Sequence, residues 1–190
     1  MRSIKLAVVV LGVGVTGGLV GASGSGQDAT PIEELIPALS SPTSKTDIPP
    51  ATLGLRSLNV PDDAVIRNLG SDSLAEYWVT VADDEVCLIA DINTHAESAA
   101  SGCSPLPAFK REGLSLNAYS HVDGDTIEVE AHLVPGDVEI SPDLSDLHAS
   151  RGLQPGLITF DPRLETLETT HLYRTNGGTF ELTPVEVPDA

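Results

Sequence analysis

Two cysteines, Cys87 and Cys103, are the residues of this sequence whose chemistry follows most directly from their type and spacing. The Cys-x-x-Cys spacing that favours redox chemistry is absent. A lone pair of cysteines is typical of a structural disulfide in an exported chain, and the N-terminus indicates export, as described below. We therefore expect a Cys87–Cys103 bond, with Cys87 in a strand and Cys103 in a turn, that contributes about 3 kcal/mol of stability.

The histidines do not combine into a metal site in the hairpin that we expect for residues 114–134. His121 and His132 both point outward there, but they lie about 20 Å apart along the strands and cannot bind one metal ion. His95 and His148 lie in loops whose positions do not follow from the sequence. No His-Glu-x-x-His motif or clustered Cys/His spacing indicates zinc.

Calcium is the metal that the acidic loops could hold, because hard cations take six to eight oxygen ligands. No EF-hand loop is present, and acid pairs such as those around Asp123-Gly124 more often form turns. Calcium is therefore a weak candidate, and we expect no other cofactor. The candidate ligands are Asp123, Asp125, Asp137, Asp143 and Asp146.

The motifs of nucleophilic and phosphate chemistry are absent, so we predict no catalytic residue. The closest approach to Gly-x-Ser-x-Gly is residues 21–25, which ends in serine and lies beside the N-terminal apolar run. No Gly-x-x-x-x-Gly-Lys loop is present. A pair of carboxylates of the glycosidase type depends on spatial rather than sequence proximity and stays open. The scarcity of aromatic residues for sugar stacking argues against it.

The charge of the chain excludes one class of partner. With 28 acidic residues against 10 basic ones, the formal net charge is −18. Phosphate binding needs Lys and Arg side chains that displace counterions, so nucleic acid is not an expected partner. Such a charge attracts cations or a basic protein, and it is also typical of a well-solvated surface.

The N-terminus has the pattern of a targeting segment. Arg2 and Lys5 precede an uncharged apolar run at residues 6–20, and Val20-Gly21-Ala22 offers small residues to a signal peptidase. The run is short and rich in glycine, which favours cleavage, although an uncleaved membrane anchor stays open. No cysteine lies nearby, which excludes the usual lipoprotein anchor. We expect a secreted or cell-surface protein that meets the membrane only through this segment.

The next segment, residues 23–58, has the composition of a linker with a short helix. Thr30, Pro31 and Glu33 are typical of a helix start. Pro37 allows only about two turns, too few to be stable alone. The segment is either a strap packed on the domain or a disordered tether. Its apolar residues, which fall on one helical face, are Ile32, Leu35, Ile36 and Leu39.

After residue 58 the apolar period changes to two, so residues 59–187 are expected to form a β domain. Strands at 76–82 and 85–91 would pair Val81 with Val86 around Asp83-Asp84. The 114–134 hairpin would turn at Asp123-Gly124, a preferred type I′ pair, and place Ala118 opposite Val129. A last hairpin at 169–183 would bring Tyr173, Phe180 and Leu182 together. Residues 141–162 would be mostly loop.

The fold class predicted from these strands is all-β: an antiparallel sandwich or barrel-like domain with one disulfide, preceded by a signal or anchor segment and a short helical linker. Pieces of the chain resemble a group of small exported proteins of high-GC Gram-positive bacteria that has no assigned activity. The resemblance implies export and a disulfide-linked β domain. The chain departs from the group at residues 135–137, where it has Pro-Gly-Asp in place of Pro-Asp-Gly. The matching pieces are Tyr77-Trp78-Val79, Val86-Cys87-Leu88-Ile89, Gly102-Cys103, Gly113-Leu114 and Leu133-Val134-Pro135.

Three functions stay open at this point. The first is a non-enzymatic exported or surface-tethered β domain that contacts another protein or serves the envelope. The second is an extracellular hydrolase whose site has no recognisable motif. The third is a calcium-dependent adhesion or stability module.

Overall fold

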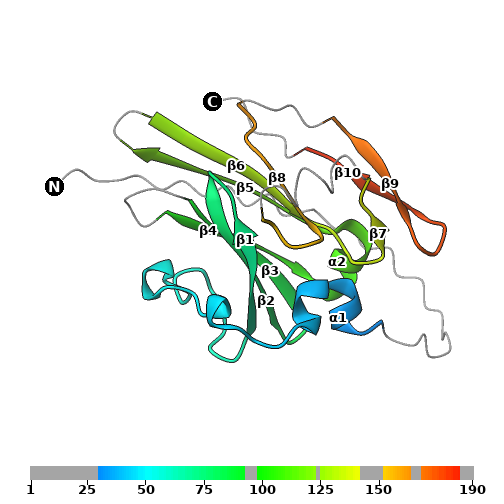
Figure 1. Ribbon diagram of the computed structural model, residues 1–190, viewed down its shortest axis with the longest axis horizontal. Helices are drawn as coiled ribbons and strands as arrows, with labels where there is room; N and C mark the ends of the chain where they lie inside the picture. Colours follow the sequence, from blue (N-terminus) through cyan, green and yellow to red (C-terminus); the bar gives the residue numbers. More distant parts are fainter. Residues whose placement is uncertain (1–29, 93–97, 123–124, 142–151, 164–167, 185–190) are drawn as a thin grey trace, which may run out of the picture.

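The computed structural model describes residues 30–92, 98–122, 125–141, 152–163 and 168–184, and these residues form three antiparallel sheets (Figure 1). The first sheet has the strand order β1-β2-β3-β4, from β1 (Val65–Ser71), β2 (Ala75–Ala82), β3 (Glu85–Ile92) and β4 (Ala99–Pro105). The second has the order β5-β6-β8, from β5 (Leu114–Val122), β6 (Asp125–Leu133) and β8 (Leu157–Phe160). The third has the order β10-β9-β7, from β7 (Val138–Glu139), β9 (Thr170–Arg174) and β10 (Thr179–Leu182).

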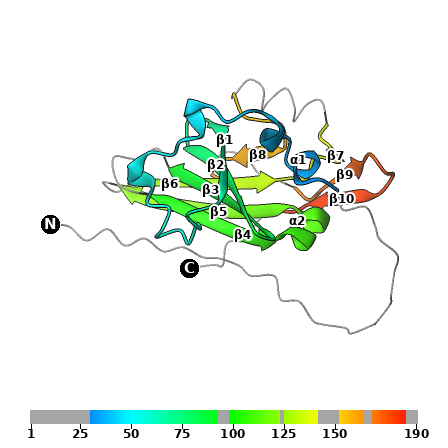
Figure 2. The same cartoon turned by 90° about the horizontal axis from the view of Figure 1, so that it is seen from below.

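The first two sheets pack face to face around the main core, as in a β-sandwich (Figure 2). Alternate residues of the central strands point into this core because the side-chain period of a strand is two. Val79 and Leu88 come from the first sheet and Val129 and Ala131 from the second, and all four are completely buried. The predicted antiparallel β fold with one disulfide is therefore confirmed.

Both long hairpins have the predicted register. Val81 pairs with Val86 across β2 and β3, and Ala118 pairs with Val129 across β5 and β6. Asp83, in the turn between β2 and β3, has a positive φ of 49°, which the tight turn requires and which Asp tolerates. In the β5–β6 hairpin the apolar alternation fixed the register, because a one-residue slip would turn one strand's apolar residues to the opposite face.

Residues 30–64, which precede β1, are part of the fold. This segment contains α1 (Ile32–Leu35) and three 3₁₀ turns, Pro37–Ser40, Lys45–Asp47 and Ala51–Leu53. Leu35 and Ile36 are buried in the main core. Of the two predicted alternatives, this part of the segment is therefore a strap packed on the domain rather than a disordered tether. The backbone N–H of Gly136 donates to the carbonyl of Leu35 at 2.8 Å, so α1 rests directly on the loop after β6. Further along, Leu53 and Val60 cover Trp78 on the outer face of the first sheet.

The outer edge of β1 is covered by two other parts of the chain. The Asn68 N–H donates to Asp47 Oδ1 at 2.8 Å, and the Leu69 carbonyl accepts from the Gln154 N–H at 2.8 Å. Burial raises the pKa of Asp47, but hydrogen bonds from Ser44 and Asn68 outweigh it and hold this pKa below its usual value. The pairing with β2 shifts register between Asn68 and Gly70, so the edge is also irregular.

Two sequence predictions about local structure are wrong, and a third was incomplete. Cys103 lies in strand β4 rather than in a turn. The described part of residues 141–162 is mostly loop, as predicted, but it also contains β8, whose short apolar run Leu157–Phe160 pairs with β6. In the last hairpin Tyr173 points to solvent, 68 % exposed, because its neighbour Leu172 takes the buried face beside Phe180 and Leu182.

Candidate functional site

The disulfide between Cys87 and Cys103 joins neighbouring strands β3 and β4 at directly opposite positions. The two Cα atoms are 4.0 Å apart. Cys87 is buried and Cys103 is exposed, and a carboxylate oxygen of Glu85 lies 3.9 Å from the sulfur of Cys87. Among the described residues, these three are the one group spaced as metal ligands. The sulfurs are bonded to each other, so the role of the pair is structural.

Only one of the five predicted calcium ligands has a described side chain. Asp123, Asp143 and Asp146 lie outside the described residues, and so does the side chain of Asp125. Both carboxylate oxygens of Asp137 accept from Arg174 Nη1 at 2.8 Å. A guanidinium group already neutralises Asp137, which makes it a poor ligand for a cation.

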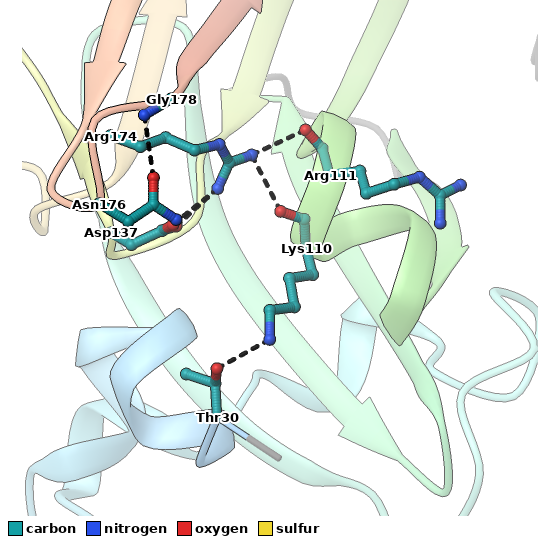
Figure 3. A network of polar contacts seen from close by, with 7 residues as sticks. All are labelled: Thr30, Lys110, Arg111, Asp137, Arg174, Asn176 and Gly178. Carbon is teal, nitrogen blue, oxygen red and sulfur yellow. Dashed lines mark hydrogen bonds and ion pairs between the residues drawn. The ribbon is translucent and has the colours of Figure 1, made fainter. Parts of the chain in front are cut away.

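Arg174 connects three elements through this contact (Figure 3). Its second nitrogen, Nη2, donates to the carbonyls of Lys110 at 2.9 Å and Arg111 at 2.7 Å, at the C-terminal end of helix α2 (Leu106–Glu112). Its guanidinium also lies over the ring of Phe180, 5.3 Å from the centroid. Arg174 therefore joins β9 to α2 and to the loop before β7.

Replacing Arg174 by Lys should lower the free energy of unfolding by about 1–3 kcal/mol, because an ammonium group lacks the second nitrogen that lets Arg174 reach the carboxylate and the carbonyls from separate positions. Urea unfolding would measure this. Arg56→Lys is the matched control, since the Arg56–Asp62 ion pair is exposed and should change stability by less than about 0.5 kcal/mol. Equal effects of the two substitutions would show that the Arg174 contacts stabilise the fold no more than an exposed ion pair does.

A carboxylate pair lies on the outer face of the first sheet. Glu76 on β2 is directly opposite Asp91 on β3. Burial, together with the negative charge of Glu76, raises the pKa of Asp91. Asn68 supports the pair by donating from Nδ2 to Glu76 Oε1 at 2.9 Å. The repulsion costs some stability at neutral pH, but these two acids alone define neither a metal site nor a reaction.

The arrangement best suited to a chemical reaction is a hydrogen-bonded series of three residues, Ser115, His132 and Glu130. Ser115 Oγ lies 2.8 Å from His132 Nδ1, and His132 Nε2 lies 2.6 Å from Glu130 Oε1. Ser115 is exposed, whereas His132 and Glu130 are 1 % and 4 % exposed. The series therefore runs from a buried carboxylate through an imidazole to a hydroxyl at the surface.

His132 lies opposite Ser115 and points outward from the main core, as predicted, but it is buried there rather than exposed to solvent. His132 lies on the outer face of β6, but Ile158 and Phe160 of β8 lie beside it, and its ring meets Phe160 edge-on. Sequence patterning showed two strands and could not show the cluster that packs against them. The predicted register already placed Ser115 opposite His132, and it placed Glu130 two residues away on the same face. The hydrogen-bonded series of these three residues could therefore have been predicted from the register. His121 is exposed, as predicted.

Comparison of the chain with protein-family models, with curated proteins and with solved structures finds no match. The resemblance to small exported proteins therefore stays a prediction. No helix among the described residues is long and apolar enough to span a membrane, and the apolar run at 6–20 lies outside them.

Proposed function

We propose that the chain acts outside the cytoplasm as a disulfide-held β domain that binds a basic surface of a partner protein, with calcium playing no central part. The cross-strand disulfide is compatible with an extracytoplasmic location. Arg2, Lys5 and the apolar run at 6–20 support export. The net charge of −18 favours a basic partner, because opposite potentials speed and orient association.

The observation that carries the binding function is the exposed face of the β9–β10 hairpin. Tyr173 is 68 % exposed there, and tyrosine is enriched in protein interfaces because it combines apolar area with a hydroxyl group. His171 and Glu181 lie on the same face and are also exposed. Arg174 holds the adjacent end of β9 against α2, so the tyrosine is presented on a fixed support. Glu181, on the same face as Tyr173, supplies the negative charge that a basic partner would contact.

A photo-crosslinking amino acid placed at position 173 should give a discrete adduct with one basic protein of the cell envelope. The adduct should weaken as salt is raised from low to physiological concentration, because charge attraction is screened. The same label at Ile48, a side chain 72 % exposed elsewhere, is the control. No adduct from position 173, equal adducts from both positions, or an adduct confined to the cytosol would contradict the proposal.

A second candidate function, an extracellular hydrolase, is favoured by one observation: the Ser115–His132–Glu130 chain has the order of groups that nucleophilic catalysis uses.

A further inference from the structure

We propose that Ser115 is a nucleophile for acyl transfer, that His132 is its general base, and that Glu130 is the positioning residue behind it. The substrates are small carboxylic esters that carry no negative charge. This assignment gives residues and a reaction to the second candidate function. It does not depend on partner binding at Tyr173, and the two proposals can fail separately.

The geometry comes from the strand pairing. Ser115 and His132 are directly opposite on β5 and β6, where facing side chains stand close together. Glu130 is two residues before His132 on β6 and so lies on the same face. All three groups sit on paired strands rather than on loops, which holds the hydrogen-bond distances of 2.8 Å and 2.6 Å.

The order of donors and acceptors is the one that a base-activated serine needs. An ionised carboxylate only accepts hydrogen bonds, so Glu130 selects the imidazole tautomer with its proton on Nε2. The other nitrogen of a neutral His132, Nδ1, is then free to accept the proton of the Ser115 hydroxyl. A nucleophile, a base and a group that orients the base are the three parts of an activated serine.

Burying the polar side chains of His132 and Glu130 costs folding free energy, which a functional role would explain. His132 and Glu130 are buried beside Ile158 and Phe160 of β8, and replacing a buried ionisable pair by apolar residues is often neutral or stabilising. Here the polar chain ends at an exposed hydroxyl rather than at another buried group. A substrate can therefore reach the one atom of the chain that would react.

The reaction balances without any additional cofactor. Ser115 Oγ forms a bond to the ester carbonyl carbon, and its proton moves to His132 Nδ1. The carbon–oxygen bond to the leaving alcohol breaks, and that oxygen takes the proton from His132. Water then attacks the acyl-serine by the same proton path and releases the acid. No group is oxidised or reduced.

The substrate class follows from exposure and charge. Ser115 stands on β5, an edge strand of the second sheet, so a small acyl group can approach it from solvent. An acidic protein repels carboxylate-bearing substrates, which leaves neutral or cationic esters. Esters are preferred to amides because an alcohol leaves more readily than an amine.

The test uses the full exported chain and a fluorophosphonate probe, which modifies activated serines covalently. Mass spectrometry should place the label on Ser115, and Ser115→Ala should abolish it. The matched control Ser71→Ala removes an exposed strand serine and should label like the wild type. Hydrolysis of p-nitrophenyl acetate should fall to the buffer rate in Ser115→Ala alone.

Three variants separate catalysis from a structural role. His132→Gln should slow labelling by about 100-fold or more, the usual contribution of a general base. If that variant does not fold, Glu130→Gln serves: it should slow labelling of the folded protein, and Glu130→Asp, which keeps a carboxylate to orient His132, should restore part of the lost rate. A purely structural Glu130 would leave the labelling rate of both folded variants at the wild-type value.

The absence of label on Ser115 in the folded wild type would overturn the proposal. Labelling of Ser71 at the same rate would overturn it too, because that result means general surface reactivity. Ser115→Ala should leave the crosslink from position 173 intact, so a failure here leaves the binding function standing.

Discussion

Reduction of the Cys87–Cys103 disulfide should lower the free energy of unfolding by about 2–4 kcal/mol. The bond closes a loop that contains the β3–β4 connection, and reduction returns that loop's freedom to the unfolded chain. A loss of this size is a large part of the stability of a small domain. The bond also fixes the pairing of β4, which is one of the two edge strands of the first sheet.

Urea unfolding with and without reductant measures the effect, and the chain's single tryptophan reports it. Trp78 is buried on the sheet face that also carries Cys87, since Cys87 pairs with Thr80 two residues away on β2. The control is the double variant Cys87→Ala/Cys103→Ala. Reductant should lower the urea midpoint of the wild type to that of the double variant, and it should leave the midpoint of the double variant unchanged. Two free thiols in freshly isolated protein would show that the bond does not form.

Gly136→Ala should lower the free energy of unfolding by about 3 kcal/mol, the effect of uncovering one or two buried aliphatic side chains. A Cβ at Gly136 would clash with the carbonyl oxygen of Glu34, which is backbone and cannot rotate away. Helix α1 would have to move, and Leu35 and Ile36 would lose their place in the core.

The matched control is Gly102→Ala, because neither glycine has a positive φ. A Cβ at Gly102 would meet its nearest atoms at 3.6 Å, an ordinary contact. Urea unfolding should place the control within about 0.5 kcal/mol of the wild type, or slightly above it. Limited proteolysis should cut the Gly136→Ala variant faster within residues 37–64. Equal stability of the two variants would mean that α1 adjusts without leaving the core.

The hairpins could be predicted because their information is local. Residues 114–134 alternate between apolar and polar, and the turn carries Asp-Gly, so one register satisfies both constraints. The elements that were missed lack such signals. β1 has Arg67, Asn68 and Gly70 in its interior, and α2 is seven residues long with a proline in its first turn. β8 has four residues and gains its structure from pairing with β6.

The candidate site could be predicted only in part, for a related reason. Its members follow from the register, since Ser115 faces His132 and Glu130 is two residues away. The burial of His132 and Glu130 does not, because it depends on β8, which comes later in the chain. Asp137 shows the same limit: its sequence context suggests a cation ligand, and its partner Arg174 is 37 residues away.

The covered edge of β1 bears on how the protein behaves when many copies are crowded together. An open strand edge is a template on which another chain can add a strand, and this is a common route to aggregation. On β1, Asp47 occupies the N–H of Asn68 and Gln154 occupies the carbonyl of Leu69. An incoming strand would have to displace both contacts and match an irregular register. Asp47→Ala should therefore make the protein more prone to self-association.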